Sequence, residues 1–159
     1  MKRLVSWAIP VARFFLQQYW RISRPLTAGA RVLVIDASGK VLLVRHTYVE
    51  GWYLPGGGVD RGETMRAAAA REIWEEAGIV ANGDLTLFGL YANFKEFKSD
   101  HIALYVLRDF RQEARKSAEI AEFGFFSMDA LPEGTSVATR ARLREWVEGQ
   151  VPPDYWVTG

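Results

Sequence analysis

The sequence predicts a single α/β domain in which helices cover the faces of a mixed β-sheet. The chain has 159 residues, which is enough for one domain with a sizeable core. Hydrophobic residues make up 49% of it and charged residues 25%, the balance of an ordinary globular protein. Strand-like runs lie before and after an alanine-rich helical segment. The order strands, helix, strands, helix is typical of a sheet packed between helices.

The first strands are predicted from alternating apolar residues and turn residues. Residues 30–36 carry valines on one face, and Ser38-Gly39 predicts a hairpin turn into a second strand at residues 40–45. Residues 52–54 fit a further short strand. The run Pro55-Gly56-Gly57-Gly58 that follows is predicted to be a loop.

A helix is predicted at residues 64–77, because this segment is rich in alanine and has no internal glycine or proline. Gly78 follows it as a natural helix stop. The elements predicted downstream are strands at 85–95, 101–110 and 120–127, a turn at 131–134, a helix at 137–148 and a surface tail at 151–159. In the last helix, the apolar side is predicted to carry Leu143, Trp146 and Val147.

Residues 1–24 are predicted to be a separate amphipathic helical segment ahead of a domain at residues 25–159. Basic residues precede a short apolar stretch, but Pro10 interrupts it and no cleavage pattern follows. The stretch is also shorter than the ~20 residues that span a bilayer. We expect this segment to pack on the domain or on a partner subunit; binding at a membrane surface is the alternative. The chain is expected to be a monomer or a homodimer.

Charge and cysteine content limit the function classes. Twenty Lys and Arg residues against nineteen Asp and Glu give a formal charge of +1, which does not suggest a large nucleic-acid surface. A small anionic substrate remains compatible with this balance. The absence of cysteine excludes disulfides, thiolate zinc sites and cysteine nucleophiles. A reducing cytoplasm is the expected location.

The predicted helix at 64–77 carries a cluster of carboxylates. Glu72, Glu75 and Glu76 share one face, because residues three and four apart are neighbours on a helix. Like charges at this spacing repel, and a divalent cation between the carboxylates removes that cost. Oxygen ligands suit hard ions such as Mg²⁺ or Mn²⁺. Glu63, in the loop ahead of the helix, completes the carboxylate set.

The glycine run at residues 56–58 is the second candidate element of the site. Without side chains, its backbone can approach a ligand closely. A carbonyl of this run is a candidate metal ligand, and the amides of Gly57 and Gly58 are candidates for contacting phosphate oxygens.

The joint spacing of these residues resembles that of a known family. Gly57, five residues, Glu63, seven residues and then Arg71-Glu72-Ile73-Trp74-Glu75-Glu76-Ala77-Gly78-Ile79 resemble the complete Nudix box, with no departure at a defined position. At roughly 5–7% frequency per residue type, a chance match at one start position is on the order of one in a billion. The order of elements from about residue 27 to 148 is compatible with the family fold, and residues 1–24 lie outside it.

The resemblance implies an α/β/α sandwich whose box forms a loop, a helix and a loop. It implies hydrolysis of a phosphoanhydride bond in a nucleoside diphosphate linked to another group, with Mg²⁺ or Mn²⁺ as the cofactor. The implied metal-binding groups are Glu72, Glu75, Glu76, Glu63 and the carbonyl of Gly56, with Glu76 and Glu72 as direct ligands. Arg71 is implied to orient a glutamate through a salt bridge.

The general base and the substrate contacts are less constrained. The base comes either from the box or from Glu119 or Glu122, which lie outside it. Arg45 is a candidate for contacting phosphate, and Tyr48 for stacking on a base. Other aromatic or cationic residues with open roles are Trp52, Tyr53, Phe94, Lys95, Phe97, Lys98 and His101.

Three alternatives accompany this interpretation. A Nudix-fold module that senses a nucleotide typically lacks box carboxylates, which this chain retains. A diphosphate isomerase of the same fold depends on cysteine, which this chain lacks. A hydrolase recruited to membranes through residues 1–24 is the third. The family marks of ADP-ribose, dinucleoside-polyphosphate and NADH enzymes are missing downstream of the box, which leaves nucleoside triphosphates and nucleotide sugars open.

Overall fold

The computed structural model describes residues 26–94 and 99–156. Its elements are β1 (Thr27–Val34), β2 (Val41–His46), β3 (Gly56–Gly58), α2 (Met65–Ala77), β4 (Ile79–Ala81), β5 (Thr86–Ala92), β6 (Asp100–Leu107), β7 (Phe110–Gln112), β8 (Ile120–Phe126) and α3 (Val137–Glu148). Neither helix in these two ranges is long and apolar enough to cross a bilayer. The predicted helix within residues 1–24 lies outside the described residues.

The central sheet is mixed, as the sequence predicts. Four strands are ordered β3-β1-β6-β5, and two further pairs join β2 to β8 and β4 to β7. β1 runs parallel to β6 and antiparallel to β3, and β5 runs antiparallel to β6. β3 is therefore an edge strand, and its position beside β1 brings the glycine run against the centre of the sheet.

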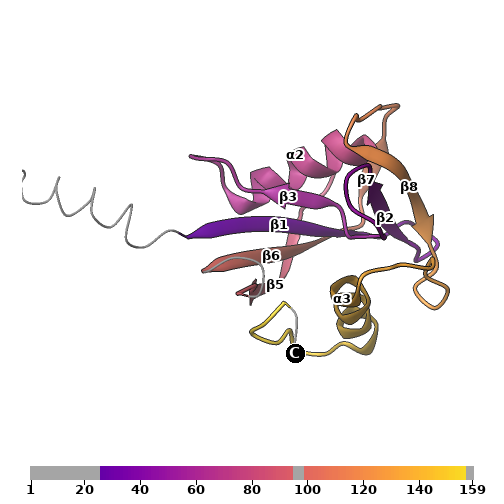
Figure 1. Cartoon of the computed structure of the whole chain (residues 1–159). Coiled ribbons are helices and arrows are strands. Elements are labelled where there is room, and N and C mark those ends of the chain that lie inside the picture. The colour runs from indigo at the N-terminus through magenta and orange to yellow at the C-terminus, as the bar shows by residue number, and fades with distance from the viewer. Residues whose placement is uncertain (1–25, 95–98, 157–159) are drawn as a thin grey trace, which may run out of the picture.

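The two faces of the sheet pack on different helices (Figure 1). Val32 and Val34 of β1 pack with Ile73 of α2 in one buried cluster. Leu33 alternates to the opposite face, where it packs with Leu143 of α3 in a second buried cluster. The predicted α/β sandwich with a mixed sheet is confirmed, and side chains of β1 alternate between its two cores.

Helix α2 has clear signals at both ends. The side chain of Thr64 caps the N-terminus by accepting a hydrogen bond from the backbone of Ala67 at 3.1 Å. Gly78 ends the helix in the left-handed region with φ of 66°, and its N–H donates to the carbonyls of Ile73 and Trp74. The caps fix which residues of the acidic segment face the sheet and which face the glycine run.

The prediction that residues 55–58 form a loop is wrong for the glycines. Gly56, Gly57 and Gly58 form β3 and pair antiparallel with Arg31, Ala30 and Gly29. Glycine has low strand propensity, so the local sequence does not indicate a strand here. Close approach to β1 is the physical reason, since a Cβ at Gly56 would lie 2.1 Å from the carbonyl oxygen of Ala30.

Other differences concern short elements and the C-terminal segment. β4 and β7 pair over three residues each, and the sequence did not indicate this pair. Val147 is 63% exposed, so it does not belong to the buried side of α3. The prediction of a surface tail at residues 151–159 is wrong for Trp156, which is buried and whose N–H donates to the carbonyl of Ala92 on β5.

Gly56→Ala is expected to destabilise the fold by about 2–5 kcal/mol, through backbone strain and overpacking. Gly56 has φ of 138°, and an added Cβ would meet backbone atoms that cannot rotate away. Urea denaturation followed by circular dichroism measures the effect. Gly58→Ala is the matched control, because the space around its Cβ position is open. Equal unfolding midpoints for the two variants would contradict the tight β1–β3 contact.

Candidate active site

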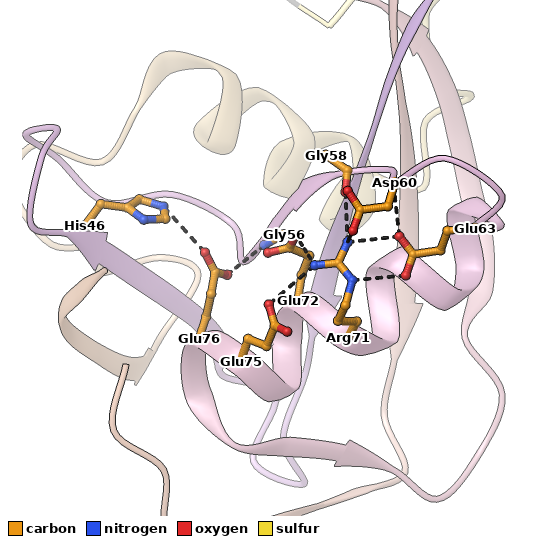
Figure 2. Close-up of polar contacts among 9 residues, drawn as sticks. All are labelled: His46, Gly56, Gly58, Asp60, Glu63, Arg71, Glu72, Glu75 and Glu76. Atoms are coloured by element: carbon orange, nitrogen blue, oxygen red, sulfur yellow. Dashed lines mark hydrogen bonds and ion pairs between the residues drawn. The ribbon is translucent and has the colours of Figure 1, made fainter. Parts of the chain in front are cut away.

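The candidate site forms where α2 faces the edge strand β3. α2 contributes the glutamates and Arg71, β3 contributes its glycine backbone, and the end of β2 contributes His46 (Figure 2). A Cβ at Gly57 would lie 2.4 Å from the nearest carboxylate oxygen of Glu72. The missing side chain at Gly57 thus leaves the room that the Glu72 carboxylate occupies.

Arg71 lies at the centre of an acidic cluster (Figure 2). Its guanidinium makes a bidentate pair with Glu63, at 3.0 and 2.9 Å, and donates to Glu72 at 2.7 Å. It also reaches Glu75 at 3.4 Å and the carbonyl of Gly58 at 3.0 Å. The hydrogen bonds to Glu63 and Glu72 raise the pKa of Arg71 above its ordinary value, and the bond to Glu63 has the larger effect. Arg71 therefore holds the loop glutamate and the helix glutamates in one arrangement.

Glu76 lies on the other side of the cluster and is the most buried of its carboxylates. One carboxylate oxygen accepts a hydrogen bond from the N–H of Gly56 at 2.8 Å, and the other lies 3.7 Å from Nε2 of His46. Burial raises the pKa of Glu76 to about 8, although the Gly56 hydrogen bond acts in the opposite direction. A carboxyl group whose pKa lies near neutral pH is typical of functional sites.

The raised pKa of Glu76 predicts a pH-dependent stability in the metal-free protein. The unfolded chain releases this proton near pH 4.5, whereas the folded chain keeps it until about pH 8. Stability therefore falls as pH rises from 5 to 8, on the order of 1–3 kcal/mol for this group. Glu76→Gln is neutral throughout and lacks this fall. Denaturant unfolding in a chelator at pH 5, 6.5 and 8 measures the effect, and parallel profiles for wild type and variant would refute it.

The residues present fit a divalent ion that retains part of its water shell. Within the described ranges, no three His, Asp or Glu groups form a preassembled metal cage. The oxygen donors that meet at the Gly56-Gly57 segment come from Glu72 and Glu76, with the backbone beside them. Mg²⁺ is usually held by one or two carboxylates together with waters and substrate phosphates. Two carboxylates at a glycine backbone therefore match its chemistry.

The predicted residues outside the box fall into two groups. Glu119 lies near Glu76, since its charge raises the pKa of that carboxyl, and its carbonyl accepts from the N–H of Thr47 at 2.8 Å. Glu122 instead forms an ion pair with Arg45 at 2.7 Å across the β2–β8 pair. In the described part of the chain, neither member of this pair bonds to a box residue. Glu119 therefore lies next to the end of β2, near enough for its charge to act on Glu76, whereas Arg45 and Glu122 are paired with each other.

The predicted aromatic contacts also differ in their surroundings. Tyr48 is 69% exposed, and its ring centroid lies 5.1 Å from that of His46, next to Glu76. Trp52 is buried in the core on the α3 side. Tyr53 donates through its hydroxyl to the carbonyl of Glu50 at 2.7 Å and lines a cavity on that side. Phe97, Lys95 and Lys98 lie outside the described residues.

His46 and Arg31 are further candidate site residues, and the sequence did not indicate either of them. Nδ1 of His46 and one terminal nitrogen of Arg31 are buried, and neither has a hydrogen-bond partner among the described residues. Burial and then the charge of Arg31 lower the pKa of His46. The charge of Arg31 also lowers the pKa of Glu76, although its side chain lies on the same face of β1 as Leu33, in the core on the α3 side. A lone arginine inside an apolar strand run was the available sequence signal for Arg31.

Comparisons with known proteins agree with this geometry. The family model of the NUDIX domain matches residues 25–147. A Bacillus subtilis (strain 168) protein named "Putative 8-oxo-dGTP diphosphatase" is 52% identical over 52 residues, which are 33% of this chain and 35% of that protein. An RNA pyrophosphohydrolase of Cereibacter sphaeroides (strain KD131) is 58% identical over 63 residues, 36% of this chain and 39% of its own. The chain therefore spans well under half of either curated relative.

Solved structures match over a larger part of the chain. The crystal structure of a MutT NUDIX hydrolase from Burkholderia pseudomallei has a TM-score of 0.65 and 27% identity, covering 76% of this chain and 98% of that one. A NUDIX hydrolase from Nitrosomonas europaea has a TM-score of 0.66 over 81% of this chain and 93% of its own, and at 16% identity this similarity shows the fold alone. With a family model matched over most of its length, the chain belongs to the NUDIX domain family.

Proposed function

We propose that this protein hydrolyses a phosphoanhydride bond in a nucleotide or nucleotide derivative, with Mg²⁺ or Mn²⁺ as the cofactor. The observation that carries the proposal is the convergence of the Glu72 and Glu76 carboxylates on the Gly56-Gly57 backbone. A pyrophosphate group is densely anionic, so bare carboxylates would repel it. A bound divalent ion would neutralise that charge and lower the pKa of a bound water.

The residues of the chain have distinct roles in this proposal. Glu72 and Glu76 would hold the ion, together with the carbonyl of Gly56. Arg71 is a positioning residue, because its guanidinium holds Glu72 and Glu63 in place rather than facing open space. Glu75 is the most exposed of the helix glutamates, with 43% of its side chain accessible, and its carboxylate would add a third oxygen donor to the metal site.

Glu119 is the preferred outside candidate for the general base. Its charge acts on Glu76, His46 and Tyr48, so it lies beside the carboxylate cluster. Glu122 is held by Arg45, which disfavours proton transfer at the box. A base must lie within hydrogen-bond reach of the attacking water or one water away. Glu119→Gln should therefore lower kcat more than Glu122→Gln does.

The names of the relatives guide the choice of substrates to test. One relative is named for an oxidised deoxynucleoside triphosphate and another for RNA. We propose that this chain acts on a nucleoside 5′-polyphosphate, either free or at an RNA end. The panel therefore contains the common nucleoside triphosphates, 8-oxo-dGTP, a 5′-triphosphorylated RNA oligonucleotide, nucleotide sugars and ADP-ribose.

Hydrolysis of this panel with Mg²⁺ and with Mn²⁺, with products identified by mass spectrometry, tests the proposed function. The expected result is cleavage of at least one substrate between two phosphorus atoms, giving a phosphorylated nucleoside or RNA end. Cleavage at a phosphoester bond would contradict the proposal. Nucleotide binding without turnover of any substrate would instead favour a sensing module.

A further inference from the structure

Arg31 occupies an unusual position for a charged residue. It lies in the middle of β1, paired with Gly56 of β3 on one side and with Leu104 of β6 on the other. Its side chain shares the face of Leu33, which is fully buried in the core on the α3 side. Arg31 is itself half-buried, and a partly desolvated cation costs free energy unless a partner compensates it.

No protein group supplies that partner in the part of the chain that the structure describes. Nη1 of Arg31 is buried without a hydrogen-bond partner, and Arg31 takes part in none of the ion pairs found among the described residues. The nearby Glu76 directs its oxygens to Gly56 and His46 instead. Nη1 of Arg31 is therefore a buried donor without an acceptor, although the charge of Arg31 acts on Glu76 and His46.

Two neighbouring cavities meet at Arg31. One, of about 260 Å³, runs along the β3 edge and is lined by Gly57, Gly58 and Asp100, among others. The second, of about 170 Å³, lies toward α3 and is walled by Tyr53 and Trp156, among others. Each is smaller than the ~300 Å³ at the lower end of ligand pockets, so a nucleotide-sized ligand would have to extend past Arg31.

The composition of the two linings determines which chemistry Arg31 suits. Of the described residues that line either cavity, Arg31 is the only cationic one. The acidic group at the far end, Asp100, accepts hydrogen bonds from Thr27 at 2.8 Å and from Asn93 at 3.0 Å. The cavity by the glycine edge is therefore lined by an unpartnered donor of Arg31, and that donor is positively charged. An anion is the ligand that matches it best.

We propose that Arg31 binds the phosphoryl group that remains on the nucleoside, and that it does so from the sheet face opposite the glutamate helix. This inference rests on the proposed function, because it takes the nucleotide as the ligand. β3 lies between the two groups: Glu72 abuts Gly57 on one side, and Arg31 lines the cavity at Gly57 and Gly58 on the other. The carboxylates would hold the leaving part of the pyrophosphate through the metal ion, and Arg31 would hold the part that stays.

Arg31→Met tests this inference by binding in the absence of turnover. The probes are AMP, GMP, CMP and UMP and the four matching nucleosides, titrated into full-length protein in a chelator and followed by calorimetry. We expect Arg31→Met to weaken binding of the best monophosphate by about tenfold to a hundredfold and to leave binding of its nucleoside unchanged. Arg31→Lys should recover part of the loss. Arg144→Met, at an exposed arginine of α3, is the matched control.

The unfolding of Arg31→Met distinguishes a ligand-binding role of Arg31 from a structural role. A structural arginine destabilises the fold when removed, whereas Arg31→Met removes an unsatisfied buried donor and should unfold at the same or a higher denaturant concentration. Unchanged monophosphate binding in Arg31→Met would overturn the inference. So would an equal loss for nucleoside and monophosphate, or a wild-type protein that binds none of the four monophosphates. The binding experiment measures no hydrolysis. Failure of the proposed reaction would appear as uncleaved substrates in the hydrolysis panel, whereas failure of this inference would appear in the monophosphate titrations.

Discussion

Glu76→Gln is expected to lower kcat by about a hundredfold to a thousandfold or more, while the protein remains folded. The glutamine oxygen can still accept the hydrogen bond from Gly56, so the contact between α2 and β3 survives. The variant loses the negative charge that a divalent ion requires. Turnover of the best panel substrate at saturating Mg²⁺ measures this loss, and circular dichroism checks the fold.

The matched control for this variant is Glu133→Gln. Glu133 is an exposed carboxylate in the turn ahead of α3, and it lines none of the cavities described above. It undergoes the same chemical change away from the site. Wild-type turnover in Glu76→Gln would show that the metal assignment is wrong. An equal loss in both variants would indicate an effect of surface charge rather than of the site.

Arg142→Leu is expected to destabilise the protein by about 3–5 kcal/mol, the largest effect on stability that we predict. Arg142 is 1% exposed and pairs with the buried Glu145. It also donates to the carbonyl of Trp156 at 2.7 Å, and its guanidinium lies 4.4 Å from the ring centre of Tyr91. Its removal leaves the Glu145 carboxylate buried without its counter-ion and releases the C-terminal segment.

A double variant separates the lost pair from lost packing. Arg142→Leu combined with Glu145→Leu removes both charges, so it should be less destabilised than Arg142→Leu alone. Chemical denaturation of the two variants and of wild type gives the coupling free energy. A single variant within 1 kcal/mol of wild type would contradict the role of Arg142 as the anchor of the C-terminal segment.

The fold class and the acidic helix were predictable because their signals are local. Thr64 and Gly78 mark the two ends of α2, and both act as caps in the structure. The position of Glu72 and Glu76 on one face follows from helix geometry alone. The strand at residues 56–58 was not predictable, since it depends on pairing with Ala30 and not on the preferences of glycine.

The parts of the site that come from other elements could not be read from the sequence. His46 ends β2 and faces Glu76 only because β2 lies beside the box in the folded chain. Arg31 is close to Glu76 through the pairing of β1 with β3, across 45 residues of sequence. Contacts within one helix can be predicted from the sequence spacing. Contacts between residues on different strands can be predicted only when the order of the strands in the sheet is known.

Metal removal is the sharpest test of the proposed metal-dependent hydrolysis. The measurement is the rate of substrate cleavage by the wild-type protein after chelation and dialysis, and again after Mg²⁺ or Mn²⁺ is restored. We predict that cleavage falls to the uncatalysed level without the ion and returns with it, while the chelated protein stays folded. Cleavage that continues at the original rate in the metal-free protein would contradict the account.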